Sequence, residues 1–227
     1  MPVLYMVATP IGNRGDITYR AVETLQRCDL LVCEDTRHTA RLCELYAIST
    51  LRRSFHAQSS PAELSRLLDA MDDCETVCYV SDSGTPGVSD PGYRLVRAAL
   101  DRGYTVLPLP GPSALTALLS TAGVPVNTVT FHGFLPHKKG RQTLLQGLVT
   151  APHSQVFYES VHRFPRLLTE LQQHLGPQRY LVVGRELTKL HEEVFRGSVA
   201  AAIEHFTAEN TRGEFVVLVA PPGWHPV

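Results

Sequence analysis

Short apolar runs alternate with segments of helical periodicity in the first half of this chain, and this alternation restricts the possible fold more than any other feature. Runs typical of strands lie at residues 3–8, 30–33, 76–80 and 105–109. Segments typical of helices lie between them, at 19–26, 39–46, 61–71 and 91–102. Strands that are joined through helices form βαβ units, in which neighbouring strands run parallel. We therefore predict an α/β domain around a mainly parallel sheet.

The character of the sequence changes after a helix that begins near Pro112. Residues 122–127 are rich in turn formers, so we predict one α/β domain at 1–122 and a second at 123–227. Strands are expected in the second domain near 128–133, 155–159, 180–185, 192–196 and 214–220. Helices are expected there near 141–149, 163–174 and 199–206. A chain of 227 residues is long enough for two such domains.

The composition excludes several classes of protein. Hydrophobic residues make up 44% of the chain and charged residues 19%, as in globular proteins. No run approaches the roughly 20 apolar residues that cross a bilayer, and the first residues lack a signal pattern. We expect a cytoplasmic protein without a membrane partner. Because the net charge is only -1, any contact with RNA must come from a local basic patch.

The cysteines form an odd set of five without a CxxC pair, and most of them lie in apolar runs. Reduced thiols in the core are therefore predicted rather than disulfides, and no metal site is expected.

Three loops that follow predicted strands combine glycine, proline and small polar side chains; they span residues 8–13, 81–92 and 108–114. Ligands of open α/β sheets bind beyond the carboxyl ends of the strands. Glycine lets the backbone approach a ligand closely and proline stiffens the loop, so the three loops predict a rigid small-molecule pocket. The alternative is that these residues only terminate strands. None of the loops matches the dinucleotide or nucleoside triphosphate fingerprint.

A fourth loop, after the run at 30–33, carries Glu34, Asp35, Arg37 and His38. Two carboxylates, a guanidinium and an imidazole at a strand end can order a substrate or transfer a proton. The alternative is a helix cap at Asp35 or Thr36, which would not require the two basic side chains.

Charged residues also follow strands in the second half, at 157–163 and 184–189. They either serve a ligand or form surface ion pairs, such as one between Arg185 and Glu186. The one dense basic cluster holds Lys138, Lys139 and Arg141 and is interpreted as an RNA-binding contact to phosphate; the alternative is a solvated helix start.

Eight motifs, spread in order over nearly the whole chain, closely resemble those of the ribosomal RNA small subunit methyltransferase I family, in the tetrapyrrole methylase superfamily. The motifs are LYMVATPIGNRGDIT (4–18), EDTRHT (34–39), SDSGTPGVSDPGY (81–93), PLPGPSA (108–114), GFLPHKKGR (133–141), FYESVHR (157–163), RELTKLHEE (185–193) and RGEFV (212–216).

This resemblance implies two α/β domains of the tetrapyrrole methylase type, with a mainly parallel N-terminal sheet, a mixed C-terminal sheet and a cofactor cleft between them. It implies S-adenosylmethionine as cofactor, a homodimer, and 2′-O-methylation of a cytidine ribose in the decoding region of 16S rRNA within the 30S subunit. Asp82 would be the polar anchor of the cofactor. The full set of implied cofactor contacts is Pro10, Ser81, Asp82, Gly84, Thr85, Pro86, Gly111, Ser113 and Ala114.

Methyl transfer to a ribose requires alignment of the reacting atoms and help with loss of the hydroxyl proton. The residues predicted to provide this help are Glu34, Asp35, Arg37, His38, Glu186 and Lys189, and the sequence leaves the identity of the base open. Two other functions compete: methylation of a small corrinoid or tetrapyrrole precursor, and a non-catalytic role in RNA binding or assembly. The motifs at 34–39 and 137–141 favour RNA, and the stiff loop at 81–91 favours an enzyme.

Overall fold

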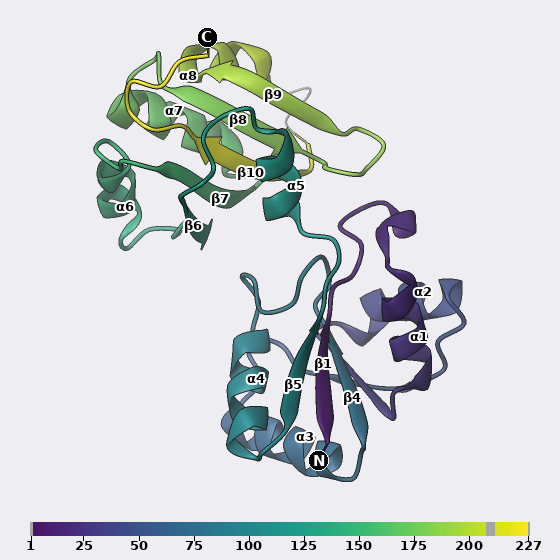
Figure 1. The fold of residues 1–227 in the computed structure, drawn as a ribbon. Coiled ribbons are helices and arrows are strands. Elements are labelled where there is room, and N and C mark those ends of the chain that lie inside the picture. Colours follow the sequence, from purple (N-terminus) through teal and green to yellow (C-terminus); the bar gives the residue numbers. More distant parts are fainter. Residues whose placement is uncertain (1, 208–211, 227) are drawn as a thin grey trace. The chain divides into compact units, whose positions relative to one another are not determined.

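The chain divides into two compact units, Met1–Ser113 and Ala114–Val227, in a computed structural model that describes residues 2–207 and 212–226 (Figure 1). Helix α5 (Ala114–Thr121) is grouped with the second unit, whereas the division at residue 122, which stays a prediction, places it in the first. Each unit is built around its own five-stranded sheet.

The sheet of the first unit is entirely parallel. Its strands are β1 (Val3–Val7), β2 (Leu30–Cys33), β3 (Leu51–Ser54), β4 (Thr76–Val80) and β5 (Thr105–Leu109), in the order β3-β2-β4-β1-β5. The predicted parallel sheet is thus confirmed. Strand β3 was not predicted, because all four of its residues are exposed and it lacks the apolar character of the other strands. Pro108, which cannot donate to a neighbouring strand, lies in the edge strand β5.

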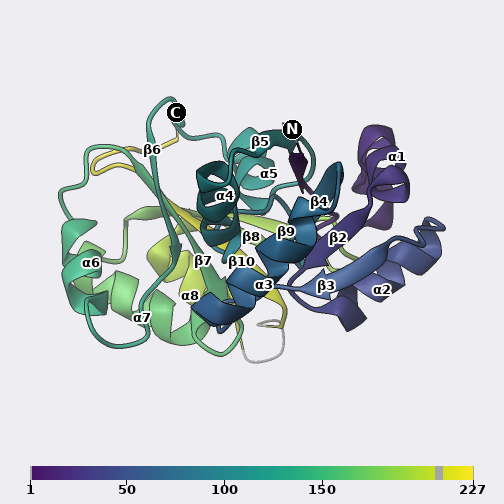
Figure 2. The same cartoon turned by 90° about the horizontal axis from the view of Figure 1, so that it is seen from below.

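Helices cover both faces of this sheet (Figure 2); they are α1 (Tyr19–Arg27), α2 (Thr36–Leu45), α3 (Pro61–Asp72) and α4 (Gly92–Asp101). Side chains of a strand alternate between the faces. Leu31 of β2 therefore packs with α1 and α2 on one face, and its neighbour Leu30 packs with α3 and α4 on the other.

Side-chain caps fix where two of these helices begin. Ser60 and Glu63 form a capping box around Pro61, the first residue of α3. Helix α2 begins at Thr36, three residues before the predicted start, because the Asp35 carboxylate accepts a hydrogen bond from the Arg37 amide at 2.8 Å.

The sheet of the second unit is mixed, as predicted. Its strands are β6 (Val129–Phe134), β7 (Ser154–Ser160), β8 (Tyr180–Arg185), β9 (Glu193–Ser198) and β10 (Glu214–Val219), in the order β6-β7-β10-β8-β9. Among the described strand pairs of this second sheet, only β6–β7 is parallel. The remaining helices are α6 (Arg141–Gly147), α7 (Phe164–Leu175) and α8 (Val199–His205).

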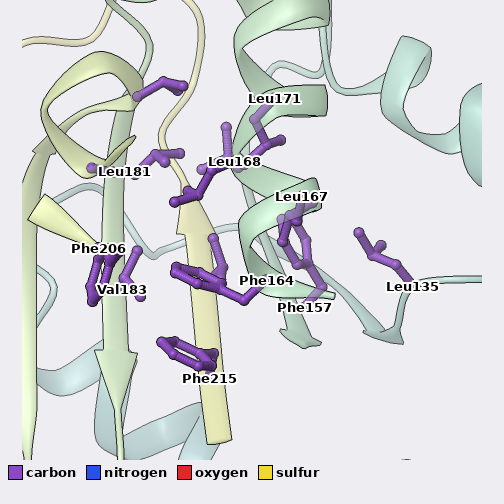
Figure 3. Close-up of a cluster of buried hydrophobic side chains, with 14 of the residues drawn as sticks. Leu135, Phe157, Phe164, Leu167, Leu168, Leu171, Leu181, Val183, Phe206 and Phe215 are labelled. Atoms are coloured by element: carbon purple, nitrogen blue, oxygen red, sulfur yellow. The ribbon is translucent and has the colours of Figure 1, made fainter. Parts of the chain in front are cut away.

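Aromatic rings form the centre of the core of the second unit (Figure 3). The ring of Phe164 on α7 stacks on Phe215 of β10 with centroids 3.9 Å apart, and Phe206, just after α8, meets Phe164 edge-on at 5.0 Å. Helix α5 contacts β8 and β10 from the opposite face, where Leu118 packs against Gly184. Within the described part of the chain, no helix has the length and apolar character to span a membrane.

Candidate active site

Three strand ends of the parallel sheet carry the glycine- and proline-containing loops: the β1 loop (8–13), the β4 loop (81–92) and the β5 loop (110–113). All strands of this sheet run in one direction, so these loops leave the sheet at the same edge. The loops are therefore neighbours in space although about 100 residues separate the first from the last.

Hydrogen bonds join the three loops directly. Thr9 and Gly84 exchange two backbone hydrogen bonds of 2.9 and 3.1 Å, which pair the β1 and β4 loops. The hydroxyl of Thr85 donates to the carbonyl of Pro112 at 3.0 Å, which joins the β4 and β5 loops. The structure thus brings together the three segments that the sequence analysis singled out.

Two glycines allow this close approach. A Cβ atom on Gly111 would lie 2.9 Å from the Cβ of Ala8, so only glycine lets the β5 loop pass the end of β1 at this distance. Gly84 has a φ of +79°, in the left-handed region that favours glycine, and a Cβ there would lie 3.2 Å from Ile11.

The β4 loop is shaped by Asp90, a residue to which the sequence analysis gave no role. Its two carboxylate oxygens accept hydrogen bonds from the amides of Gly87 and Gly92, both at 2.7 Å. The SDPG sequence at 89–92 indicates such a turn, because aspartate before proline and glycine often bonds its own backbone.

The fourth predicted loop, after β2, meets the β4 loop at Asp82. The Asp82 amide donates to Glu34 Oε1 at 3.4 Å, and Asp82 Oδ1 accepts from the Asp35 amide at 3.2 Å. His38 Nδ1 lies 3.9 Å from the same Asp82 oxygen. Residues predicted separately as catalytic and as cofactor-binding are therefore in contact.

The carboxyl group of Glu34 is a much weaker acid than an ordinary glutamate. Burial raises its pKa to about 7, and the nearby carboxylates of Asp90 and Asp82 add to the rise, although the hydrogen bond from the Asp82 amide opposes it. Glu34 is therefore able to exchange a proton near neutral pH, as a general base must.

The other three predicted residues of this loop have different environments. The hydrogen bond from the Arg37 amide lowers the pKa of Asp35, so Asp35 serves as the cap of α2, which was the alternative interpretation. The side chain of Arg37 is 93% exposed and lies 3.6 Å from Asp35, and that of His38 is 56% exposed. Both side chains are accessible to a substrate.

The remaining predicted cofactor residues divide into buried and accessible positions. The Ser81 hydroxyl is buried and donates to the Ser83 carbonyl at 3.2 Å, and Pro86 is also buried. Pro10 is half-buried and Gly111 is exposed. Ser113 and Ala114, both half-buried, are the last residue of the first unit and the first residue of the second.

In the second unit, Glu186 and Lys189 form an ion pair of 2.9 Å, and Lys189 also pairs with Glu214 at 3.0 Å. Burial opposes the charge on Lys189, but the hydrogen bonds that its ammonium group donates to both carboxylates outweigh this effect and raise the pKa of the lysine. The sequence analysis missed Glu214. Lys189 is therefore a cation held between two acids. The joint action of Lys189 and Glu34 in a cleft between the domains stays a prediction.

The predicted basic cluster separates into two kinds of residue. Lys138 and Lys139 are exposed. Arg141 is only 2% exposed, and its guanidinium pairs with Glu159 at 3.3 Å and with Glu170 at 2.7 Å. A buried, paired guanidinium cannot contact a phosphate on the surface, so Arg141 has to be removed from the set of RNA contacts. The local sequence does not reveal this burial, because the partners of Arg141 come from distant segments.

Glu159 links Arg141 to a second arginine, since it also pairs with Arg163 at 2.6 Å. Arg163 in turn donates to the carbonyl of Leu135 at 2.8 Å, and Arg141 donates to that of Pro136 at 3.2 Å. These contacts fix the segment that carries Lys138 and Lys139 to strand β7. The charges at 157–163 thus have a structural role.

Comparison with known proteins places this two-unit fold in one class. The family model described as Tetrapyrrole (Corrin/Porphyrin) Methylases matches residues 3–203. A protein from Synechocystis sp. named ribosomal RNA small subunit methyltransferase I is 45% identical to this chain, over 97% of this chain and 79% of the relative. A protein of the same name from Mesorhizobium japonicum is 44% identical, over 97% of this chain and 76% of the relative. The relative of this name from Thermotoga maritima is 40% identical over 97% of this chain and 99% of its own length.

Solved structures of low sequence identity share the fold. A cobalt precorrin-4 methyltransferase from cobalamin biosynthesis superposes with a TM-score of 0.71 at 16% identity, covering 96% of this chain and 94% of its own. Uroporphyrin-III-C-methyltransferase from Thermus thermophilus gives 0.66 at 18% identity, covering 97% and 94%. The chain belongs to the tetrapyrrole methylase family and, within it, to the family of proteins named ribosomal RNA small subunit methyltransferase I.

Proposed function

We propose that this protein uses S-adenosylmethionine to methylate the ribose 2′-hydroxyl of a cytidine in the decoding region of 16S rRNA, within the 30S subunit. The names of the relatives at 40–45% identity support ribosomal RNA of the small subunit as the substrate. We further propose that the protein works in the cytoplasm as a homodimer. The observation that carries the proposal is the joining of the β1, β4 and β5 loops beside Glu34.

The chemistry of the residues at this edge suits S-adenosylmethionine, which brings a positively charged sulfonium, an ammonium group and ribose hydroxyls. Glu34, Asp82 and Asp90 supply carboxylates, and the side chain of Asp82 is 47% exposed. Glycine and proline loops leave backbone groups accessible for the neutral parts of a ligand. We propose Asp82 as the anchor, with Pro10, Ser81, Gly84, Thr85, Pro86, Gly111, Ser113 and Ala114 forming the rest of the site.

We assign Glu34 as the general base. When bound, S-adenosylmethionine supplies a methyl group activated by the adjacent sulfonium. Glu34 accepts the proton of the ribose hydroxyl, because a carboxyl group with a pKa near 7 is partly ionised at neutral pH and is a stronger base than an ordinary carboxylate. Arg37 and His38, exposed beside it, bind the substrate. Alignment of the reacting groups contributes further, by about 7–11 kcal/mol in the best intramolecular cases.

Lys138 and Lys139 are proposed as phosphate contacts, since both are exposed on a segment held rigid by the Arg141 network. The names of the relatives favour RNA over the related small-molecule activity. A non-catalytic assembly factor would not need an ionisable Glu34 beside three joined loops.

The decisive experiment maps ribose methylation on 16S rRNA from cells with and without the protein. One cytidine in the decoding region is expected to lose its 2′-O-methyl group when the protein is absent. Purified protein should methylate 30S subunits and leave tetrapyrrole precursors unchanged. Methylation of a tetrapyrrole, or an unchanged ribose map, would refute the proposal.

The variant Asp82→Ala is expected to weaken S-adenosylmethionine binding by at least about tenfold, because a hydrogen bond to a charged group contributes roughly 1.5–3 kcal/mol. Calorimetric titration measures the affinity. Asp82→Asn retains an acceptor for the Asp35 amide but removes the charge, which separates the two roles. Asp73→Ala, at an exposed aspartate after α3, is the control. An affinity of Asp82→Ala equal to that of the control would exclude Asp82 as the anchor.

A further inference from the structure

A row of basic side chains lies on the surface of the first unit, outside the residues assigned to cofactor binding. Helix α2 exposes Arg37, His38 and Arg41, and the neighbouring edge strand β3 exposes Arg52. We call these four residues the basic strip. Helix α2 and strand β3 contact each other, and Figure 2 shows them side by side.

Helix periodicity places three members of the strip on one face. Positions 37, 38 and 41 are exposed, whereas Thr39 and Cys43 are buried against the sheet. In the parallel pairing of β2 with β3, Arg52 lies opposite Leu31, which faces α1 and α2. Side chains of paired residues share a face, so Arg52 projects on the side of the sheet that carries α2.

Two of the four side chains of the strip have no acidic partner among the described residues, and His38 has only Asp82, at 3.9 Å. In the part of the chain that the structure describes, Arg41 and Arg52 form neither an ion pair nor a side-chain hydrogen bond, and Arg37 has only Asp35 at 3.6 Å. By contrast, Arg97 and Arg102 on the other face of the sheet are paired with aspartates. Unpaired, exposed guanidinium groups are available to an anionic partner.

Charge is unevenly distributed between two segments of the first unit. Residues 36–56, which contain α2 and β3, hold four arginines and one glutamate. Residues 61–75, which contain α3, hold five acidic residues and one arginine. Because the whole chain has a net charge of only -1, its composition conceals this local excess of positive charge in α2 and β3.

Charged residues on an edge strand also prevent pairing with another chain. That role explains Arg52 and Arg53 but not the arginines of α2, which is not at an edge. The strip begins at the first turn of α2, directly after Glu34 and beside Asp82. Arg37 and Arg41 are four residues apart, a rise of about 6 Å along the helix. The strip therefore leads away from the proposed catalytic carboxyl group.

We propose that the basic strip binds the phosphodiester backbone of the rRNA on one side of the methylated nucleotide. This inference rests on the proposed function. Arginines bind phosphate oxygens through paired donors, and three of the four side chains of the strip are arginines, whereas none is Phe, Tyr or Trp. It therefore contributes affinity independent of base sequence, in addition to any contribution of Lys138 and Lys139.

The test compares the double variant Arg41→Gln/Arg52→Gln with the wild type in methylation of 30S subunits over a range of KCl concentrations. The KM for 30S subunits is expected to rise about tenfold or more, with kcat at saturation within about twofold. The slope of log(kcat/KM) against log[KCl] should fall in magnitude by about 1.5, since each phosphate contact contributes roughly 0.7–0.9. Affinity for S-adenosylmethionine in calorimetry should not change.

The control Arg66→Gln/Arg97→Gln removes the same charge from α3 and α4, on the opposite face, and should leave KM and slope at wild-type values. Equal effects of both double variants, or no effect of the strip variant, would overturn the inference. If wild-type protein does not methylate 30S subunits, the proposed function fails separately. In that case, the role of the basic strip is tested by measuring the binding of single-stranded RNA oligonucleotides in the same salt series. Equal Kd values for the wild type and the strip variant would then overturn the inference.

Discussion

Replacing Glu34 with glutamine is expected to lower kcat for methylation of 30S subunits about 10²–10⁴-fold, the usual contribution of a general base. Glutamine has the shape of glutamate and keeps an oxygen to accept the hydrogen bond from the Asp82 amide, but it cannot take a proton. Affinity for S-adenosylmethionine should stay within about threefold of the wild type. Single-turnover methylation with saturating substrates measures the effect on chemistry.

The pH dependence gives this prediction a second readout. The folded-state pKa of Glu34 is raised to about 7, so its carboxyl is protonated below that pH and ionised above it. The kcat of the wild type should therefore rise with pH through about 7 and then level off, and Glu34→Gln should lose this step. Glu44→Gln, at an exposed glutamate of α2, should keep it. A normal rate and an unchanged pH step in Glu34→Gln would assign the base to another residue.

Truncating Glu159 to alanine is expected to lower the free energy of unfolding of the second unit by about 3–5 kcal/mol. Glu159 pairs with Arg141 and Arg163, and its removal leaves the buried Arg141 guanidinium with one carboxylate partner fewer. Urea unfolding followed by fluorescence of Trp224 is a suitable measurement, because this residue, the single tryptophan, contacts Tyr180 within that unit.

Glu204→Ala, at an exposed position of α8, is the control and should change stability by less than about 0.5 kcal/mol. A loss below about 1 kcal/mol in Glu159→Ala would show that water compensates the remaining charges and that the network contributes little. The variant also tests the surface role of Lys138 and Lys139, since a loosened segment should raise the KM for 30S subunits at temperatures where the protein stays folded.

Much of the fold follows from the sequence because burial leaves a clear pattern. Strands β2, β4 and β5 have the predicted bounds, since each forms a compact apolar run with turn residues beyond it. Strand β3 has no such pattern, because its residues are exposed and its position is set by pairing with β2. The start of α2 was also misjudged, because the Asp35 cap extends the helix into polar residues that have no apolar periodicity.

The loops that meet at this edge of the sheet were easier to predict than the chemical states of their side chains. The loops could be selected because glycine, proline and polar side chains at strand ends are visible along the chain. The raised pKa of Glu34 could not be predicted from the sequence, since it depends on burial and on Asp90, which lies 56 positions further along the chain. The burial of Arg141 depends in the same way on Glu159 and Glu170. Local sequence identifies such groups, and tertiary contacts determine their charge and accessibility.

The two hydrogen bonds that Asp90 accepts from Gly87 and Gly92 close the β4 loop into a ring of backbone and side chain. A loop closed in this manner has its shape before any ligand arrives, so little conformational entropy is lost when a ligand binds. Entry and departure of a small molecule then require no refolding of this segment. The β4 loop can therefore keep the same conformation through successive rounds of turnover. We expect the used methyl donor to be replaced rapidly compared with the release of a large RNA.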